Sequence, residues 1–207
     1  MIVIVDPPAT AGGTDIGPTA FVMKLIALIF MMCGVLSVPQ LQHKWELADA
    51  ATVRLSPRAF RPLPRNVIHT LEARGCSIPQ LFGTSEPHNV IKGEFIKKGQ
   101  TDWAVLCSRN KRSSILIFAG GSSKRVIAIA ESADRTFLQT IDGAGSIGFS
   151  RAIDAVGKDF LVKHHEEYGG PSLPPIDHQG INDAFVEKGS VVHYYYRGKW
   201  LQLQGAD

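Results

Sequence analysis

Four apolar runs in the middle of the chain, each seven or eight residues long, constrain the fold more than any other feature of the sequence. Turn-forming segments with the sequences GQT, RNKR and GSSK separate them. Connections this short join antiparallel neighbours, because a parallel crossover needs about a dozen residues or more. The sequence therefore predicts an antiparallel meander of Asn89–Ile96, Asp102–Ser108, Ser113–Gly120 and Arg125–Glu131. The last three runs are apolar at odd and even positions, so both faces of the sheet should be covered.

Helical patterns lie on both sides of these runs. Pro64 is suited to open a short helix with Val67, Ile68 and Leu71 on one face, and Gly75 is suited to end it. A weaker pattern precedes this helix, and an amphipathic one ends in two glycines near the C-terminus. In chain order, the predicted helices cover residues 38–55, 64–75 and 157–170.

Further strands are expected after the meander. Asp134–Asp142 and Ser146–Ala155 flank a glycine-rich turn, and GINDAFVEK with SVVHYYYRGKWLQL predicts a terminal hairpin that turns at Arg197–Lys199. The prediction is a mainly β fold, with an α+β fold as the alternative. It consists of an antiparallel meander, a short N-terminal helix and one helix before a C-terminal hairpin.

The N-terminal region carries the pattern of an export signal. Leu25–Leu36 is continuously apolar but too short to span a bilayer as a helix. Lys24 precedes it and Ser37 ends it, which predicts a signal peptide over Met23–Ser37 and a mature chain from Val38. Cys33 leaves a lipid anchor open, although the bulky residues before it differ from those of a lipobox.

The expected organisation follows from that signal. Residues 1–22 contain no basic residue and are interpreted as a misassigned start or a disordered leader. They precede the signal peptide at 23–37, an N-terminal segment with a proline-rich connector at 38–64, and a single β-rich domain at 65–207. The mature protein is expected to be extracytoplasmic, either periplasmic or secreted, with no membrane span.

Removal of the signal peptide leaves two cysteines, Cys76 and Cys107. An even number of cysteines in an oxidising compartment indicates a disulfide. The alternative is that Cys107, which lies inside an apolar run, is a reduced core residue. Net charge is +3 and the basic residues are scattered among turns, so no nucleic-acid partner is predicted.

The same short sequence pattern precedes two of the predicted strands. Gly99 and Asp102 stand before one apolar strand, and Gly180 and Asp183 stand in the same spacing before another. A chance likeness of two β-hairpins is the alternative. The segments GEFIKKGQTDWAVLCS and IDHQGINDAFVEK resemble degenerate FG-GAP and VCBS-type repeats of extracellular β-propellers, over roughly 30 residues per copy. The resemblance implies blade-like hairpins in an exported protein and no particular activity.

Loops of that family commonly bind calcium, and Asp177, Asn182 and Asp183 supply a partial set of oxygen ligands. The favoured interpretation is instead that Asp102 and Asp183 are structural and accept hydrogen bonds from the backbone of their own turns. No metal and no cofactor are predicted.

Aromatic residues are concentrated at the C-terminus. Tyr194, Tyr196 and Trp200 form a candidate binding stripe, since tyrosine and tryptophan are frequent interface anchors. Cross-strand packing on the sheet is the alternative explanation.

No motif for nucleophilic catalysis or phosphate binding occurs in the sequence. The leading functional hypothesis is therefore a non-catalytic extracytoplasmic binding or structural module, with an envelope protein or a glycan as its partner. The alternative is a secreted hydrolase that uses Glu166, Asp177 and His178.

Overall fold

The computed structural model describes residues 38–206, so the predicted signal peptide, the leader and Cys33 lie outside the described residues. Contacts between Cα atoms divide the chain into two units, Met1–Gln42 and His43–Asp207. Only the first residues of helix α2 (Val38–Ala51) are described in the first unit.

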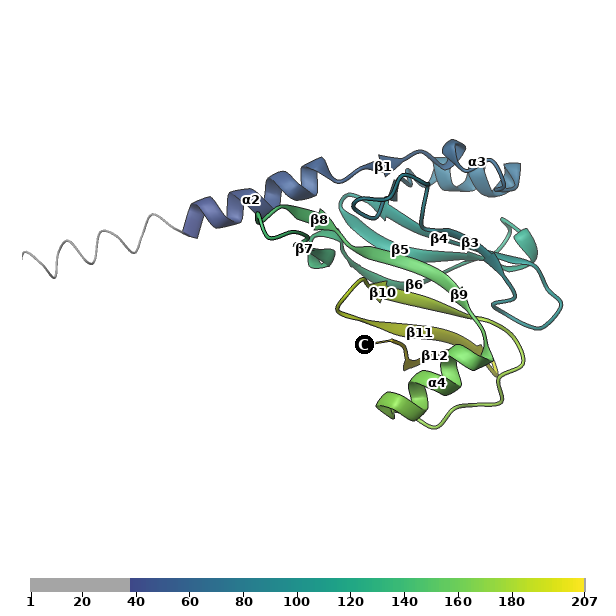
Figure 1. The fold of residues 1–207 in the computed structure, drawn as a ribbon. Helices are drawn as coiled ribbons and strands as arrows, with labels where there is room; N and C mark the ends of the chain where they lie inside the picture. Colours follow the sequence, from purple (N-terminus) through teal and green to yellow (C-terminus); the bar gives the residue numbers. More distant parts are fainter. Residues whose placement is uncertain (1–37, 207) are drawn as a thin grey trace, which may run out of the picture. The chain divides into compact units, whose positions relative to one another are not determined.

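The central meander is confirmed (Figure 1). Strands β3 (Val90–Gly93), β4 (Asp102–Arg109), β5 (Arg112–Phe118) and β6 (Val126–Ala133) form a four-stranded antiparallel sheet in chain order. β3 ends earlier than predicted, because the backbone N–H groups of Phe95 and Ile96 turn away from the sheet to the carboxylate of Asp102.

A second four-stranded meander follows in the C-terminal part. It consists of β9 (Arg151–Val156), β10 (Gly180–Phe185), β11 (Gly189–Tyr196) and β12 (Lys199–Gln204), with helix α4 (Lys158–Tyr168) between its first two strands. The hairpin at Arg197 and Gly198 lies where the sequence predicts it.

Short elements complete the fold. Helix α3 (Arg65–Ala73) begins after Pro64, and Gly75 follows it with a φ of +68°. That left-handed conformation favours glycine, which explains why the helix ends there. The remaining elements are the strands β1 (Arg54–Leu55), β2 (Ile78–Pro79), β7 (Leu138–Thr140) and β8 (Ile147–Phe149), and the 3₁₀ turns η1 (Pro57–Ala59), η2 (Ala119–Gly121) and η3 (Asp134–Phe137).

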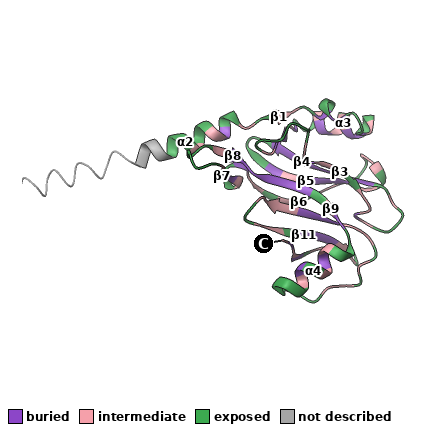
Figure 2. Cartoon of the chain, in the orientation of Figure 1, coloured by how far each residue is buried: buried purple, intermediate pink, exposed green. Residues whose placement is uncertain are grey.

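The two large sheets pack face to face, and each carries a helix on its outer face (Figures 1 and 2). Side chains alternate along β4, so that Leu106 enters the core between the sheets whereas Val105 packs under α3. On the other side of the molecule, Leu161 of α4 packs on the second sheet. β4 and β5 are covered on both faces as predicted, but β6 is an edge strand and stays partly exposed.

The cysteine pair is joined as predicted. Cys76 follows α3 and Cys107 lies on β4, with their Cα atoms 5.2 Å apart, a separation typical of a disulfide. A backbone bridge between Ser77 and Ser108 continues the contact. The disulfide therefore attaches the end of α3 to the middle of the first sheet.

Asp102 is fully buried at the start of β4, and both of its carboxylate oxygens are in use. Oδ2 accepts hydrogen bonds from the backbone N–H groups of Phe95 (2.8 Å) and Ile96 (2.9 Å). Oδ1 accepts from the backbone N–H of Gly120 (2.7 Å) and from the side chain of Gln100 (2.7 Å). One carboxylate thus closes two loops at the same end of the sheet.

Asp102→Asn is expected to destabilise the protein by about 1–3 kcal/mol, because an amide nitrogen must then face buried donors that lose their acceptor. Urea unfolding of both proteins measures the change. Asp142→Asn is the matched control, since Asp142 also accepts backbone hydrogen bonds, but in an exposed turn. Equal changes in the two variants would contradict this role for Asp102.

Candidate functional site

A buried arginine joins the two sheets. Arg151 is the first residue of β9 and is only 1% exposed. Its Nε donates to Oδ1 of Asp183 (2.8 Å) and its Nη2 donates to Oδ2 (2.7 Å), which makes a bidentate pair. Asp183 lies on the neighbouring strand β10, and its side chain is 9% exposed. Such a planar, two-point contact is the strongest type of side-chain ion pair.

The remaining N–H groups of Arg151 reach the other sheet. Nη1 donates to Oγ (3.0 Å) and, more weakly, to the carbonyl oxygen (3.4 Å) of Ser113, and Nη2 donates to the carbonyl oxygen of Ala130 (2.8 Å). Ala130 has a φ of +53° at the point where the pairing of β5 with β6 shifts register. That β-bulge turns its carbonyl toward the guanidinium. The ring of Phe137 lies 4.4 Å from the guanidinium carbon.

His193 completes this cluster. It is buried on β11, with Nε2 3.5 Å from Oδ2 of Asp183 and no hydrogen-bond partner for Nε2 among the described residues. Burial acts to raise the pKa of Asp183, but Arg151 and His193 outweigh it and hold the pKa below its ordinary value. The aspartate is therefore ionised at neutral pH.

The cluster lines a recess of about 360 Å³. Two serines also border it, but Ser190 Oγ donates to the carbonyl of Ala206 and Ser132 Oγ bonds Thr136. Among the described residues, neither is hydrogen-bonded to His193. A nucleophile needs such a base within reach. The arrangement therefore favours a structural tie between the sheets over acyl-transfer chemistry.

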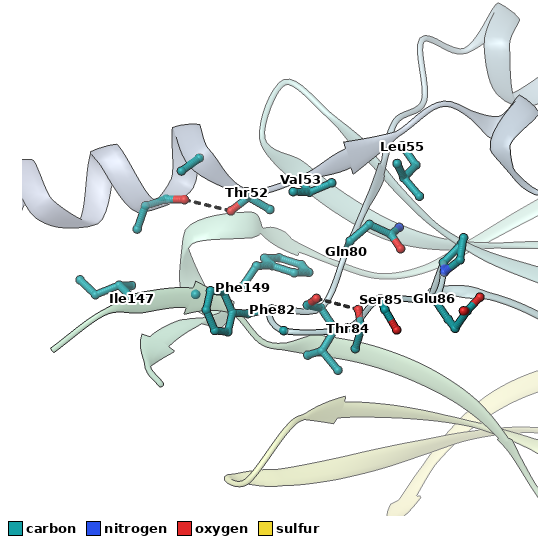
Figure 3. Close-up of a pocket in the computed structure, with 16 residues that line it drawn as sticks. Thr52, Val53, Leu55, Gln80, Phe82, Thr84, Ser85, Glu86, Ile147 and Phe149 are labelled. Carbon is teal, nitrogen blue, oxygen red and sulfur yellow. Dashed lines mark hydrogen bonds between the residues drawn. The ribbon is translucent and has the colours of Figure 1, made fainter. Parts of the chain in front are cut away.

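A second cavity, of about 380 Å³, is mainly apolar (Figure 3). We call it the Phe82 pocket. It is lined by residues from the end of α2, the segment after it, the loop before β3, and β8: Ala48, Ala51–Val53, Leu55, Gln80–Pro87 and Ile147–Phe149. The end of α2 is held in place by ion pairs of Asp49 with Arg54 (2.9 Å) and Lys111 (2.8 Å).

Phe82 is exposed but fixed in this pocket. Its backbone N–H donates to the carbonyl of Phe149 (2.8 Å). Its side chain lies directly over Gly148, where an added Cβ would stand 2.6 Å from the Phe82 side chain. Only glycine therefore permits this packing, and the ring stays 57% exposed at the pocket.

The polar side chains of the pocket are mostly occupied internally. Gln80 donates to the carbonyls of Ile78 and His88 and accepts from the backbone of His88. Thr52 and Thr84 donate to backbone carbonyls within their own segments (Figure 3). Glu86 is exposed and makes no ion pair or hydrogen bond with any other described residue. The pocket thus offers apolar contact, one carboxylate and the hydroxyl group of Ser85.

Of the residues of the hydrolase hypothesis, Asp177 and His178 lie side by side, with Oδ1 of Asp177 3.9 Å from Nε2 of His178, whereas Glu166 contacts neither of them among the described residues. His178 stacks on Tyr194, and both of its ring nitrogens lie within hydrogen-bonding distance of backbone carbonyls. Asp177 bonds the hydroxyl of Tyr194 and is otherwise largely exposed. Glu166 lies on the exposed face of α4. Tyr194 and the backbone therefore engage His178 and Asp177 in structural contacts.

The prediction of equivalent turns at Asp102 and Asp183 is wrong. Gly99 lies in a loop with a φ of +76°, whereas Gly180 is the first residue of β10. Asp183 lies inside that strand, where its carboxylate bonds Arg151 rather than a turn. The calcium set also fails to converge, because Asn182 and Asp183 are consecutive strand residues and point to opposite faces.

The candidate stripe is divided between two faces. Tyr194 and Tyr196 lie on the face that packs with α4. Trp200 pairs across the strands with Tyr195, which points the other way, and packs in the core between the sheets. The stripe is therefore not one binding surface, because cross-strand partners share a face.

Sequence analysis did not single out Arg151, His193 or Phe82. The available signal for Arg151 was a lone arginine at the start of an apolar strand, because a buried charge there needs a partner. No local pattern identified Phe82, since its exposure depends on Gly148, which is distant in sequence.

Residues 38–206 contain no cluster of three or more histidine, cysteine, aspartate or glutamate side chains suited to a metal ion. No helix in this range has the length and apolar character needed to cross a membrane. Comparison of the chain with protein-family models, with curated proteins and with solved structures found no match.

Proposed function

We propose that this protein is a non-catalytic extracytoplasmic binding module whose Phe82 pocket receives an apolar group of its partner. The observation that carries the proposal is the exposed but fixed ring of Phe82 at the edge of an apolar cavity. Apolar surface that is exposed next to a concave, mainly apolar pocket is a common feature of binding sites. The disulfide supports an oxidising compartment.

The surface around the pocket also exposes apolar side chains. Val53, just after α2, is 61% exposed and lines the pocket, and Leu47, next to the lining residue Ala48 in α2, is 55% exposed. Burying apolar groups of this size contributes about 1.5–3 kcal/mol each. The partner therefore gains most by presenting a large aliphatic or aromatic side chain.

A protein partner fits this pocket better than a glycan. Sugars bind through hydrogen bonds to their hydroxyl groups, but Gln80, Thr52 and Thr84 already use their polar atoms within the protein. The carboxylate of Glu86 at the rim favours a cationic group beside the apolar one. We therefore propose an envelope protein that presents an apolar side chain next to a basic residue.

The test uses tryptamine, which combines an aromatic ring with an ammonium group, and neutral N-acetyltryptamine. Wild-type protein should bind tryptamine more tightly, as measured by isothermal titration calorimetry. Ala51→Trp should fill the pocket and weaken both ligands by about tenfold or more, since it removes the apolar burial. Ala73→Trp, at an exposed position of α3, is the matched control.

Glu86→Gln separates the two parts of the proposal. It should bring the affinity for tryptamine down to that for N-acetyltryptamine and leave the neutral ligand unchanged. If neither ligand binds, or if Ala51→Trp and Ala73→Trp behave alike, the Phe82 pocket is not the binding site. If the wild type binds tryptamine as expected but Glu86→Gln does not change its affinity, the proposal that the partner presents a basic residue is wrong.

A further inference from the structure

The outer face of the first sheet holds a third recess, of about 290 Å³, at the end that α3 leaves uncovered. Its floor is Cys107, Ser114, Leu116 and Ala128, and its rim carries the charged and polar residues Arg74, Arg109, Asn110, Arg112 and Glu131. We call it the arginine recess. The rim thus has three guanidinium groups and a single carboxylate.

The arrangement of these charges opposes the stability of the hairpin. Arg109 and Arg112 are direct cross-strand partners on β4 and β5. Like charges placed directly opposite each other on neighbouring strands destabilise a sheet. Asn110 and Lys111 form the intervening turn with φ values of +52° and +59°, which brings the two arginines close together.

The nearby acidic groups neutralise only one of the three guanidinium groups. Glu131 pairs with Arg112 (2.9 Å), and Lys111 reaches away to Asp49. Among the described residues, no carboxylate and no hydrogen-bond acceptor is in contact with the side chain of Arg74 or Arg109. Two guanidinium groups at the rim are therefore available to a ligand.

The disulfide fixes the third arginine in place. Arg74 is the C-cap of α3, and Cys76, two residues later, is bonded to Cys107 in the floor of the recess. The backbone N–H of Cys76 also donates to the carbonyl of Leu71 (3.0 Å). Arg74 is thus held beside a hairpin that is distant in sequence, and the disulfide links the two segments covalently.

We propose that the arginine recess binds a phosphate or sulfate ester. Guanidinium groups match tetrahedral oxyanions through paired N–H donors, and the amide of Asn110 and the hydroxyl of Ser114 add neutral donors. A bound dianion converts the repulsion between Arg109 and Arg112 into attraction to a shared partner. This second site is separate from the Phe82 pocket, since the two share no lining residue.

The test compares the melting temperature of full-length mature protein in sulfate, inorganic phosphate and glucose 6-phosphate, each against sodium chloride at the same ionic strength. The three oxyanions should raise the melting temperature of the wild type above that in chloride. Glucose 6-phosphate should act at least as strongly as inorganic phosphate, because an ester is the proposed ligand. Glucose without phosphate should have no effect.

Arg109→Gln gives a change of opposite sign in the two conditions. Without oxyanion it should raise the melting temperature at low salt, since it removes a like-charge pair. In the presence of oxyanion, the variant should lose most of the rise in melting temperature that the wild type shows. Calorimetry should show that its binding of glucose 6-phosphate is about tenfold weaker. Arg74→Gln should weaken binding without that stabilisation.

Arg65→Gln is the control, because Arg65 is an exposed arginine outside the recess and its loss changes the net charge equally. The proposal is overturned if chloride stabilises as well as the oxyanions or if Arg65→Gln loses the effect to the same extent. Stabilisation by inorganic phosphate without any by glucose 6-phosphate would rule out an ester.

Discussion

Arg151→Met is expected to lower the free energy of unfolding by about 3–5 kcal/mol, because it leaves the carboxylate of Asp183 buried without its partner. Arg151 is almost fully buried and donates to Asp183, Ser113 and Ala130. Methionine keeps the length of the chain but supplies none of these hydrogen bonds. The two sheets also lose one of their polar connections.

Chemical unfolding in urea, followed by circular dichroism, measures this loss. Arg151→Met combined with Asp183→Leu should be more stable than Arg151→Met alone, since it removes the unpaired charge as well. Arg58→Met is the control, because Arg58 pairs with Glu72 on an exposed surface and its loss should change stability far less. Similar losses at the exposed and buried sites would show that the cluster is not a structural tie.

The cluster of Arg151, Asp183 and His193 should also affect how the stability of the protein depends on pH. The pKa of Asp183 is lowered in the folded protein, so its contribution is present above the unfolded-state pKa of about 3.9 and is lost as pH falls through the folded-state pKa. Asp183→Asn removes this contribution. The stability difference between wild type and variant should therefore narrow as pH falls below about 4.

The parts of the fold that can be predicted from the sequence are mainly those determined by residues close together along the chain. β4 and β5 are apolar on both faces and are joined by a turn too short for any other arrangement than a hairpin. Helix α3 carries its own start and stop signals in Pro64 and Gly75. Cys76 and Cys107 remain as one pair if the predicted signal peptide, which contains Cys33, is set aside.

The parts that escaped prediction depend on residues distant in sequence. Asp102 and Asp183 share the same local spacing, yet Asp102 meets the backbone of two loops whereas Asp183 meets Arg151 across a strand pair. Spacing alone does not reveal that Gly180 already lies in the strand. Trp200 illustrates the same limit, because its face is set by the register of β12 against β11.

Reduction of the Cys76–Cys107 disulfide is expected to lower the free energy of unfolding by about 3–4 kcal/mol, because the bond closes a loop with a sequence separation of 31 residues. The cross-link restricts the unfolded chain, and in the folded protein it also holds α3 on the first sheet. Comparing oxidised and reduced wild type in urea measures the effect of the bond without a change of side chain at either core cysteine.

The variant Cys76→Ala/Cys107→Ala provides the control, since a reductant should not change its stability further. Thiol labelling of the unfolded, unreduced mature protein should detect neither cysteine. A change on reduction below about 1 kcal/mol would contradict the expected contribution of the bond. The reduced protein should also bind glucose 6-phosphate more weakly, because Arg74 depends on Cys76 for its place at the arginine recess. Unchanged binding after complete reduction, in protein shown by circular dichroism to be folded, would mean that α3 holds Arg74 without the covalent link.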